Sequence, residues 1–148
     1  MNTLNVTIQL IGASQWDDDT PRKDWRVTLL MNGKTEEFVY HTGMGHKAAP
    51  APTDVIACLA SDAQNGSELF ADFCDNLGYE ADSRRALDIY LACQRTAERL
   101  RRLGVLAYLQ DPEAIEALTA VRVWTLIKPP CSRSYNLDLI STNEEAKE

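Results

Sequence analysis

The segment WRVTLLMNGKTEEFVY, residues 25–40, determines the kind of sheet that this chain can form. At its centre is Asn32-Gly33, the dipeptide preferred in the type I′ turn of a two-residue β-hairpin. Apolar and polar side chains alternate on both sides of this turn, as in strands with one buried face. Counting outward from the turn predicts the cross-strand pairs Met31–Lys34, Leu29–Glu36, Val27–Phe38 and Trp25–Tyr40.

Other segments are expected to extend this hairpin into a sheet. Residues 5–11 alternate in the same way and supply the third strand that a hairpin needs for stability. Residues 12–24 are polar and predict an exposed loop. Residues 121–127 are rich in β-branched and aromatic side chains, and they form either a fourth strand or part of a helix. Residues 137–140 could add a strand at a sheet edge.

Helices are expected between the hairpin and the C-terminal segment. Capping residues and the spacing of apolar residues predict helix starts near residues 53, 67, 83 and 111. The first three helices are expected to end at Asn65-Gly66, Gly78 and Gly104. In the second helix the expected buried stripe consists of Leu69, Phe70, Phe73, Cys74 and Leu77.

Together these elements predict an α+β fold. We expect a small antiparallel β-sheet of three or four strands, packed on one side by three or four α-helices. Residues 1–128 are expected to form a single domain, and residues 129–148 a C-terminal tail that is largely extended or disordered. In the core, Trp25, Phe38 and Tyr40 of the sheet are expected to meet Phe73, Tyr90 and Leu100 of the helices.

The composition excludes several function classes. The chain has 148 residues, of which 45% are hydrophobic and 25% charged, as expected for one soluble domain. Its net charge of −7 argues against non-specific nucleic-acid binding and against docking on anionic membranes. No apolar run could span a membrane and no signal pattern is present, which predicts a cytoplasmic protein. The widely spaced Cys58, Cys74, Cys93 and Cys131 predict reduced thiols.

The negative charge is concentrated in one stretch. No basic residue occurs between Lys47 and Arg84, whereas the rest of the chain has as many acids as bases. Such a stretch could steer the protein onto a basic partner or imitate nucleic-acid phosphates, or it could simply be a solubilising surface. The spacing of Glu68, Asp72 and Asp75 predicts that they line one face of the second helix. The expected partner-binding residues are Asp54, Asp62, Glu68, Asp72, Asp75, Glu80 and Asp82.

The long helix predicted after residue 83 is rich in arginine. Arg95, Arg99 and Arg102 share one face by their spacing and could contact an anion or nucleic acid. The alternative is a solvated helix face whose charges pair with acids of the same helix, Asp88 and Glu98 among them. We favour this alternative because pairs of this kind are common on helix surfaces.

The glycine-rich loop after the hairpin contains both histidines of the chain. His41 and His46 could supply two metal ligands, completed by Cys58 or Asp54, in a small metal-dependent or hydrolytic enzyme. Their spacing matches no established metal, phosphate or nucleophile motif. We therefore expect an ordinary turn, with no catalytic residue, no metal and no cofactor.

A series of short motifs runs from the hairpin into the long helix. In order, the motifs are Tyr40, Thr42-Gly43, His46, Pro52–Val55, Leu59–Ala63, Phe70–Cys74, Leu77–Tyr79, Asp82–Ala86 and Tyr90–Cys93. This order resembles a group of small accessory proteins encoded by phages and prophages, and the resemblance covers roughly residues 25–100. The resemblance implies a protein of the class that includes inhibitors of host defence such as anti-CRISPR proteins. Such proteins typically act by binding a host protein or ribonucleoprotein complex and not by catalysis.

We therefore expect a non-enzymatic inhibitor that binds a host defence complex through its acidic surface. Two other functions fit the residues less well: an enzyme that uses His41 and His46, and a nucleic-acid binder that uses the arginines of residues 84–102. Self-association is a separate possibility, because an exposed hairpin edge or residues 137–140 could support a homodimer.

Overall fold

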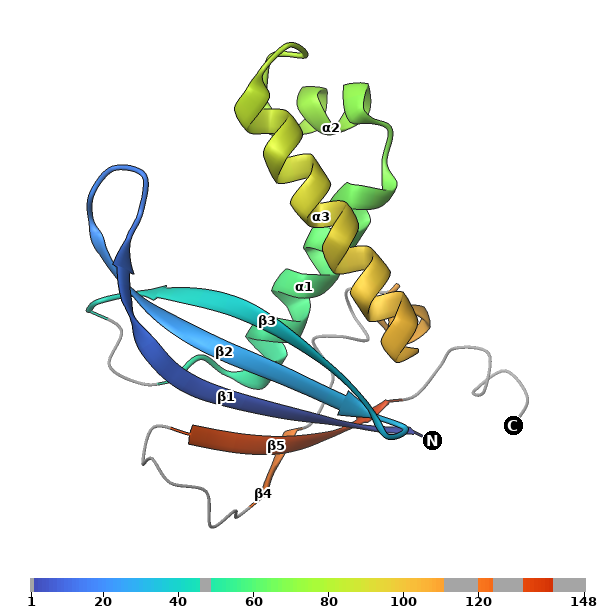
Figure 1. Ribbon diagram of the computed structural model, residues 1–148. Helices are drawn as coiled ribbons and strands as arrows, with labels where there is room; N and C mark the ends of the chain where they lie inside the picture. Colours follow the sequence, from blue (N-terminus) through green and yellow to red (C-terminus); the bar gives the residue numbers. More distant parts are fainter. Residues whose placement is uncertain (1, 46–48, 111–119, 124–131, 140–148) are drawn as a thin grey trace.

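The computed structural model describes residues 2–45, 49–110, 120–123 and 132–139, which form an α+β fold as predicted (Figure 1). The strands are β1 (Asn2–Gln15), β2 (Pro21–Met31), β3 (Lys34–Gly43), β4 (Ala120–Val123) and β5 (Ser132–Leu139). The helices are α1 (Pro52–Ser67), α2 (Phe70–Leu77), α3 (Arg84–Leu103) and the short 3-10 helix η1 (Leu106–Leu109). The helix predicted from residue 111 lies outside the described residues.

The hairpin formed by β2 and β3 confirms the predicted register. Asn32 and Gly33 both have left-handed backbone angles, with φ of 53° and 78°, as the type I′ turn requires. All four predicted pairs occur: Met31–Lys34, Leu29–Glu36, Val27–Phe38 and Trp25–Tyr40. Because side chains alternate between the two faces of a strand, this register directs Trp25, Val27 and Phe38 into the core.

The sheet contains five strands in the described parts of the chain, in the order β3-β2-β1-β5-β4 with antiparallel neighbours. β5 lies inside the sheet, between β1 and β4, and not at an edge. Its residues Leu137 and Leu139 are fully buried, because alternate positions of β5 face the helices. The domain therefore extends past the boundary predicted at residue 128, and residues 134–137 are paired on both sides, with β1 and with β4. Residues 124–131 and 140–148 lie outside the described residues.

β1 and β2 extend beyond their predicted ends and form a projecting arm (Figure 1). A register shift follows Leu10, after which residues 12–15 pair with residues 21–24. The loop predicted for residues 12–24 is therefore wrong, since only residues 16–20 connect the two strands. Side-chain polarity did not indicate these strand ends because the ladder hydrogen bonds come from the backbone.

The ends of α2 and α3 follow the predicted signals at three of four positions. Ser83 Oγ accepts a hydrogen bond from the Ala86 amide at 3.1 Å, which caps the start of α3. Gly78 and Gly104 adopt left-handed φ angles of 76° and 89° immediately after α2 and α3. The start of α2 differs from the prediction, because Ser67 is the last residue of α1 and α2 begins three residues later.

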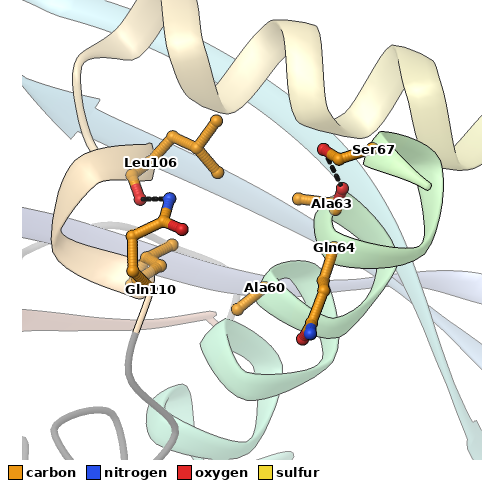
Figure 2. Close-up of a pocket in the computed structure, with 7 residues that line it drawn as sticks. Ala60, Ala63, Gln64, Ser67, Leu106 and Gln110 are labelled. Carbon is orange, nitrogen blue, oxygen red and sulfur yellow. Dashed lines mark hydrogen bonds between the residues drawn. The ribbon is translucent and has the colours of Figure 1, made fainter.

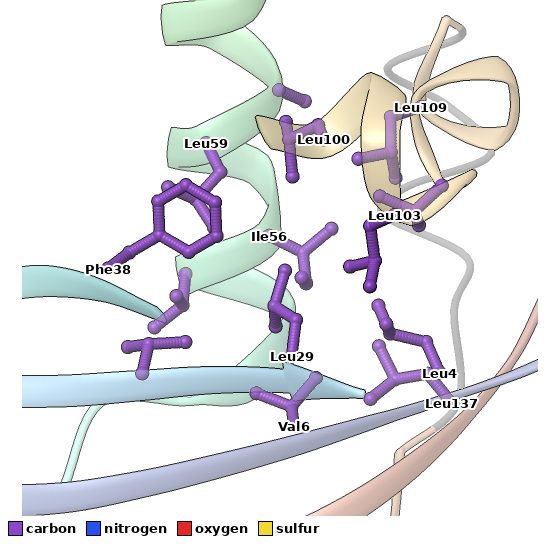
Figure 3. Packing of buried hydrophobic residues seen from close by; sticks show 14 of the residues in the cluster. Leu4, Val6, Leu29, Phe38, Ile56, Leu59, Leu100, Leu103, Leu109 and Leu137 are labelled. Carbon is purple, nitrogen blue, oxygen red and sulfur yellow. The ribbon is translucent and has the colours of Figure 1, made fainter. Parts of the chain in front are cut away.

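The main hydrophobic core lies between one face of the sheet and the helices (Figure 3). Leu4, Val6 and Leu29 come from the strands, and Ile56 and Leu100 come from α1 and α3. Each of these five side chains is 0% exposed, so burying each contributes about 1.5–3 kcal/mol. The described helices all lie on this face of the sheet (Figure 1).

A second, smaller core lies away from the sheet, between α2 and α3. Its buried members are Phe73, Cys74, Ala86 and Cys93, with Phe70, Tyr79, Ile89 and Tyr90 packed around them. The expectation that Phe73 and Tyr90 meet the sheet aromatics is therefore wrong, whereas Leu100 does share the main core with Trp25 and Phe38. The reason is the length of α3, which spans 20 residues or about 30 Å and therefore extends past the sheet.

A glycine allows α1 and α3 to pack closely where the two cores meet. Gly66 is buried in the last turn of α1, and a Cβ atom built on it would lie 2.5 Å from the backbone carbonyl carbon of Cys93. No real Cβ contact is that short, so any side chain at this position would push α1 and α3 apart. α1 ends at Ser67, one residue after the predicted Asn65-Gly66. Gly66 therefore lies inside the helix, where it allows the close packing against α3.

Gly66→Ala is expected to lower the free energy of unfolding by about 1–3 kcal/mol, because the added methyl overpacks the contact with Cys93. In an uncrowded helix the same change would stabilise by about 1 kcal/mol, so the sign of the effect is diagnostic. Gly43→Ala is the control, since a Cβ there meets nothing within 4 Å. Urea denaturation followed by circular dichroism measures both variants. Unchanged or increased stability of Gly66→Ala would show that the helices can separate without cost.

Candidate functional site

α2 and the loop that follows it lie at the end of the helical layer far from the sheet (Figure 1), and they carry an acidic surface. It consists of Asp72 and Asp75 on α2, and Glu80 and Asp82 on the loop that leads to α3. All four side chains are exposed, because α2 uses its other face to contact α3. We call these four carboxylates, together with Leu69 and Leu77 described below, the acidic tip.

The carboxylates of the acidic tip are not neutralised by the chain itself. None of the four forms an ion pair with any residue that the structure describes. The nearest bases in sequence are directed elsewhere: Arg84 Nε lies 3.4 Å from Asp88 Oδ1, and Arg85 Nη2 lies 2.8 Å from Asp17 Oδ2 on the arm. The acidic tip therefore presents unpaired negative charge to solvent.

Two leucines are exposed beside these carboxylates. Leu69 precedes α2 and is 74% exposed, and Leu77 at the end of α2 is 47% exposed. Both were expected in the buried stripe of the second helix, and this expectation is wrong. Because α2 has only eight residues, its buried face has room for Phe73 and Cys74, with Phe70 half-buried. The periodicity of the sequence could not show which apolar residues of this segment α3 would cover and which would stay exposed.

The other three predicted acids, Asp54, Asp62 and Glu68, lie outside α2 and the loop that follows it. Glu68 follows α1 and is not on α2, so the prediction that it shares a helix face with Asp72 and Asp75 is wrong. Its carboxylate accepts a hydrogen bond from Asn76 Nδ2 at 3.1 Å. Asp54 is exposed in the first turn of α1, at the end of the helix near the sheet. The sequence segment is continuous, but its acids do not form one surface.

Asp62 is half-buried on α1, close to two thiols. Burial raises the pKa of Asp62. Burial, together with Asp62 and Cys58, raises the pKa of Cys93 to about 11, and burial and Asp62 raise the pKa of Cys58. The thiols are therefore protonated at neutral pH, which makes them poor nucleophiles and poor metal ligands. Cys58, Cys74 and Cys93 are free thiols, and Cys131 lies outside the described residues.

Two of the three arginines proposed as anion contacts hold α3 against the sheet. Arg99 donates to the backbone carbonyl of Glu37 on β3 at 3.2 Å, with its guanidinium 5.9 Å from the ring centroid of Phe38. Arg102 lies 3.7 Å from the carboxylate of Glu36 on β3. Arg99 thus also covers part of the exposed hairpin edge. Arg95 is exposed and forms neither an ion pair nor a side-chain hydrogen bond with any residue that the structure describes.

The expected charge pairs along α3 are present. Arg84 pairs with Asp88 and Arg101 pairs with Glu98, both within one turn of the helix. These contacts account for Arg84 and Arg101 without a bound anion. The alternative of a nucleic-acid contact therefore has support only from Arg95.

His41 is part of a hydrogen-bonded cluster at the base of the arm. Its Nδ1 lies 2.8 Å from Asp24 Oδ1, and because a carboxylate only accepts, Nδ1 is the donor. Ser14 Oγ donates to the same oxygen at 2.8 Å and accepts from Arg22 Nε at 2.7 Å. The guanidinium carbon of Arg22 lies 4.9 Å from the centroid of the Trp16 ring, and the His41 ring centroid lies 5.8 Å from it. The cluster therefore links β1, β2 and β3 where the arm begins.

This cluster does not have the geometry of a catalytic triad. The Ser14 hydroxyl proton is directed to Asp24 and not to His41, so the imidazole does not activate the serine. Among the described residues no three His, Cys, Asp or Glu side chains are grouped to hold a metal ion. His46, the second proposed ligand, lies outside the described residues.

A small pocket lies between α1 and η1 (Figure 2). Its volume is about 140 Å³, and its lining consists of Ala60, Ala63, Gln64, Ser67, Leu106, Leu109 and Gln110. The polar groups are largely satisfied within the chain, since Ser67 Oγ donates to the Ala63 carbonyl at 2.9 Å and Gln110 Nε2 to the Leu106 carbonyl at 3.0 Å. The pocket contains no titratable side chain.

Comparisons with known proteins identify no relative: no family model, no curated protein and no solved structure matches the chain. Among the described helices, none has the length and apolar character needed to cross a membrane. Evidence for the function therefore comes from the chain's own surface. Of the features above, the acidic tip is the one whose exposed groups have no role in holding the fold together.

Asp24→Asn is expected to destabilise the protein at neutral pH and to weaken its response to acid. Partial burial raises the pKa of Asp24, but the hydrogen bonds from Ser14 and His41 and the charges of His41 and Arg22 lower it by more. The ionised carboxylate therefore stabilises the fold above its unfolded pKa, and this contribution is lost as pH falls through the lowered pKa. Urea unfolding between about pH 2 and pH 7 measures the difference. Parallel stability profiles for both proteins would contradict the role of Asp24.

Asp62→Asn is expected to have the opposite effect. The raised pKa means that the ionised carboxylate destabilises the fold at neutral pH, and the cost disappears as the pH falls below the unfolded pKa. The variant is therefore more stable than the natural protein at pH 7 and equal to it near pH 3. Thermal unfolding at the two pH values tests this expectation, with the exposed Asp72→Asn as control. A loss of stability at pH 7 would show that Asp62 has a stabilising partner.

Proposed function

We propose that this protein is a non-enzymatic binding protein that attaches to a host defence complex through the acidic tip and inhibits it. The resemblance of residues 25–100 to phage and prophage accessory proteins supports this class of target, with anti-CRISPR activity in the bacterial cytoplasm as its expected form. The binding surface is supported by a single observation, the unpaired carboxylates of Asp72, Asp75, Glu80 and Asp82 beside the exposed Leu69 and Leu77.

The two kinds of side chain in the acidic tip have different roles in binding. The carboxylates attract a basic protein surface over a distance of about 8–10 Å at physiological salt, and they accelerate association. Exposed ion pairs contribute little affinity individually, because water competes for both partners. Leu69 and Leu77 supply the apolar contact that a stable interface needs at its centre, and the carboxylates surround this contact.

Inhibition by this route requires no reaction chemistry. A protein bound to a basic surface of a defence complex blocks whatever that surface normally binds, nucleic-acid phosphates included, because both ligands require the same positive groups. The second core supports such a role, since Phe73 and Tyr90 hold α2 on α3 and keep the acidic tip at a fixed position. A preorganised surface loses less entropy on binding than a flexible one.

The triple variant Asp72→Lys, Asp75→Lys and Glu80→Lys is expected to lose the partner, with capture from host lysate reduced at least about tenfold. The control reverses three exposed acids elsewhere, Glu37, Asp54 and Asp138, and therefore has the same net charge. Affinity capture with quantitative mass spectrometry compares both variants with the natural protein.

A partner that binds through the acidic tip is lost from the first variant and retained by the control. Equal capture by the two variants would contradict the assignment, since it would mean that only net charge matters or that another surface binds. Leu69→Ser provides a test of the apolar contact, because a residue that is 74% exposed can be replaced without disturbing the fold. The expected reduction in capture is about fivefold or more.

A further inference from the structure

The solvent-facing side of α3 carries apolar and charged residues that the proposed function does not use. Residues separated by three or four positions share a helix face. On α3 this rule places six exposed residues on the side opposite the buried Ala86, Cys93 and Ala97. The six residues are Arg84, Leu87, Asp88, Leu91, Arg95 and Glu98. Leu87 and Leu91 are 38% and 40% exposed, so the middle of this face is apolar.

On the two sides of Leu91, corresponding positions on this face carry charges of opposite sign. Arg84 and Glu98 each lie seven residues from Leu91, or about 10.5 Å along the helix axis. Asp88 and Arg95 lie three and four residues from it, or about 4.5 and 6 Å. In each of these two pairs, a base on one side of Leu91 corresponds to an acid at the same or nearly the same distance on the other side.

We propose that this face of α3 binds a second copy of the chain, with the two α3 helices antiparallel and a two-fold axis passing near Leu91. In this arrangement Leu91 packs against Leu91 of the second copy, and Arg84 faces Glu98 of the second copy. Asp88 faces Arg95 of the second copy, and each of these contacts occurs twice by symmetry. A parallel arrangement would bring identical charges together and is therefore disfavoured by repulsion.

The ion pairs already present on this face do not prevent the contact. Arg84 pairs with Asp88 at 3.4 Å, but the two side chains are 85% and 62% exposed. Such a pair contributes little, and with the base on the N-terminal side its order is the less favourable one for a helix. Arg95 has no ion-pair partner in the described part of the chain, and the proposed contact would provide one. The proposal is independent of the acidic tip, which lies on α2 and the following loop.

Sedimentation velocity of the full chain over about 1 μM to 1 mM tests the proposal. We expect the average mass to rise with concentration from 16.6 kDa to twice that value. Asp88→Lys and Arg95→Glu are each expected to weaken association at least about tenfold, because each places like charges opposite one another. The double variant restores opposite charges and is expected to recover association to within about threefold of the natural protein.

The result that overturns the proposal is a monomer at all concentrations, or a dimer that none of these variants affects. A double variant as weak as the single ones would also overturn it, since another surface would then hold the copies together. Asp72→Lys changes the same kind of charge outside this face and is expected to leave association unchanged. Because all of these side chains are exposed, circular dichroism is expected to show the same helix content and thermal midpoint throughout.

Discussion

The position of the helical layer, and of the acidic tip at its end, depends on the close packing of α1 against α3 at Gly66. At this point the backbone of Cys93 occupies the space that a side chain would need, so the two helix axes approach more closely than larger residues would allow. On one side of the contact, α1 and α3 cover the sheet and form the main core. On the other side, α3 continues beyond the sheet and supports α2.

This arrangement separates the part of the protein that stabilises the fold from the part that is free to bind. The main core joins both halves of the chain, since β5 is inserted beside β1 and contributes fully buried leucines. The second core is small and covers only one face of α2. Leu69, Leu77 and four carboxylates therefore remain in solvent at the far end of the molecule, where a partner could reach them without disturbing the sheet.

Arg99, Arg102 and His41, which first suggested chemistry, have structural contacts. Arg99 and Arg102 connect α3 to β3, and His41 shares Asp24 with Ser14 at the base of the arm. These contacts join residues distant in sequence, so no local pattern could indicate them. A charged side chain within reach of an opposite charge or a backbone carbonyl satisfies its own hydrogen bonds, and only the folded chain brings those partners together.

The sequence by itself determined the local features, because these depend on neighbouring residues. Asn32-Gly33 dictated the turn and therefore the register of the hairpin, and Ser83, Gly78 and Gly104 marked helix ends. Only the tertiary structure decided which apolar residues find partners and which acids lie together. Leu69 and Phe73 look alike in the periodicity of α2, yet one is exposed and the other buried, because burial depends on what packs against the helix. The insertion of β5 into the sheet likewise reflects pairing between the two ends of the chain, which no local pattern specifies.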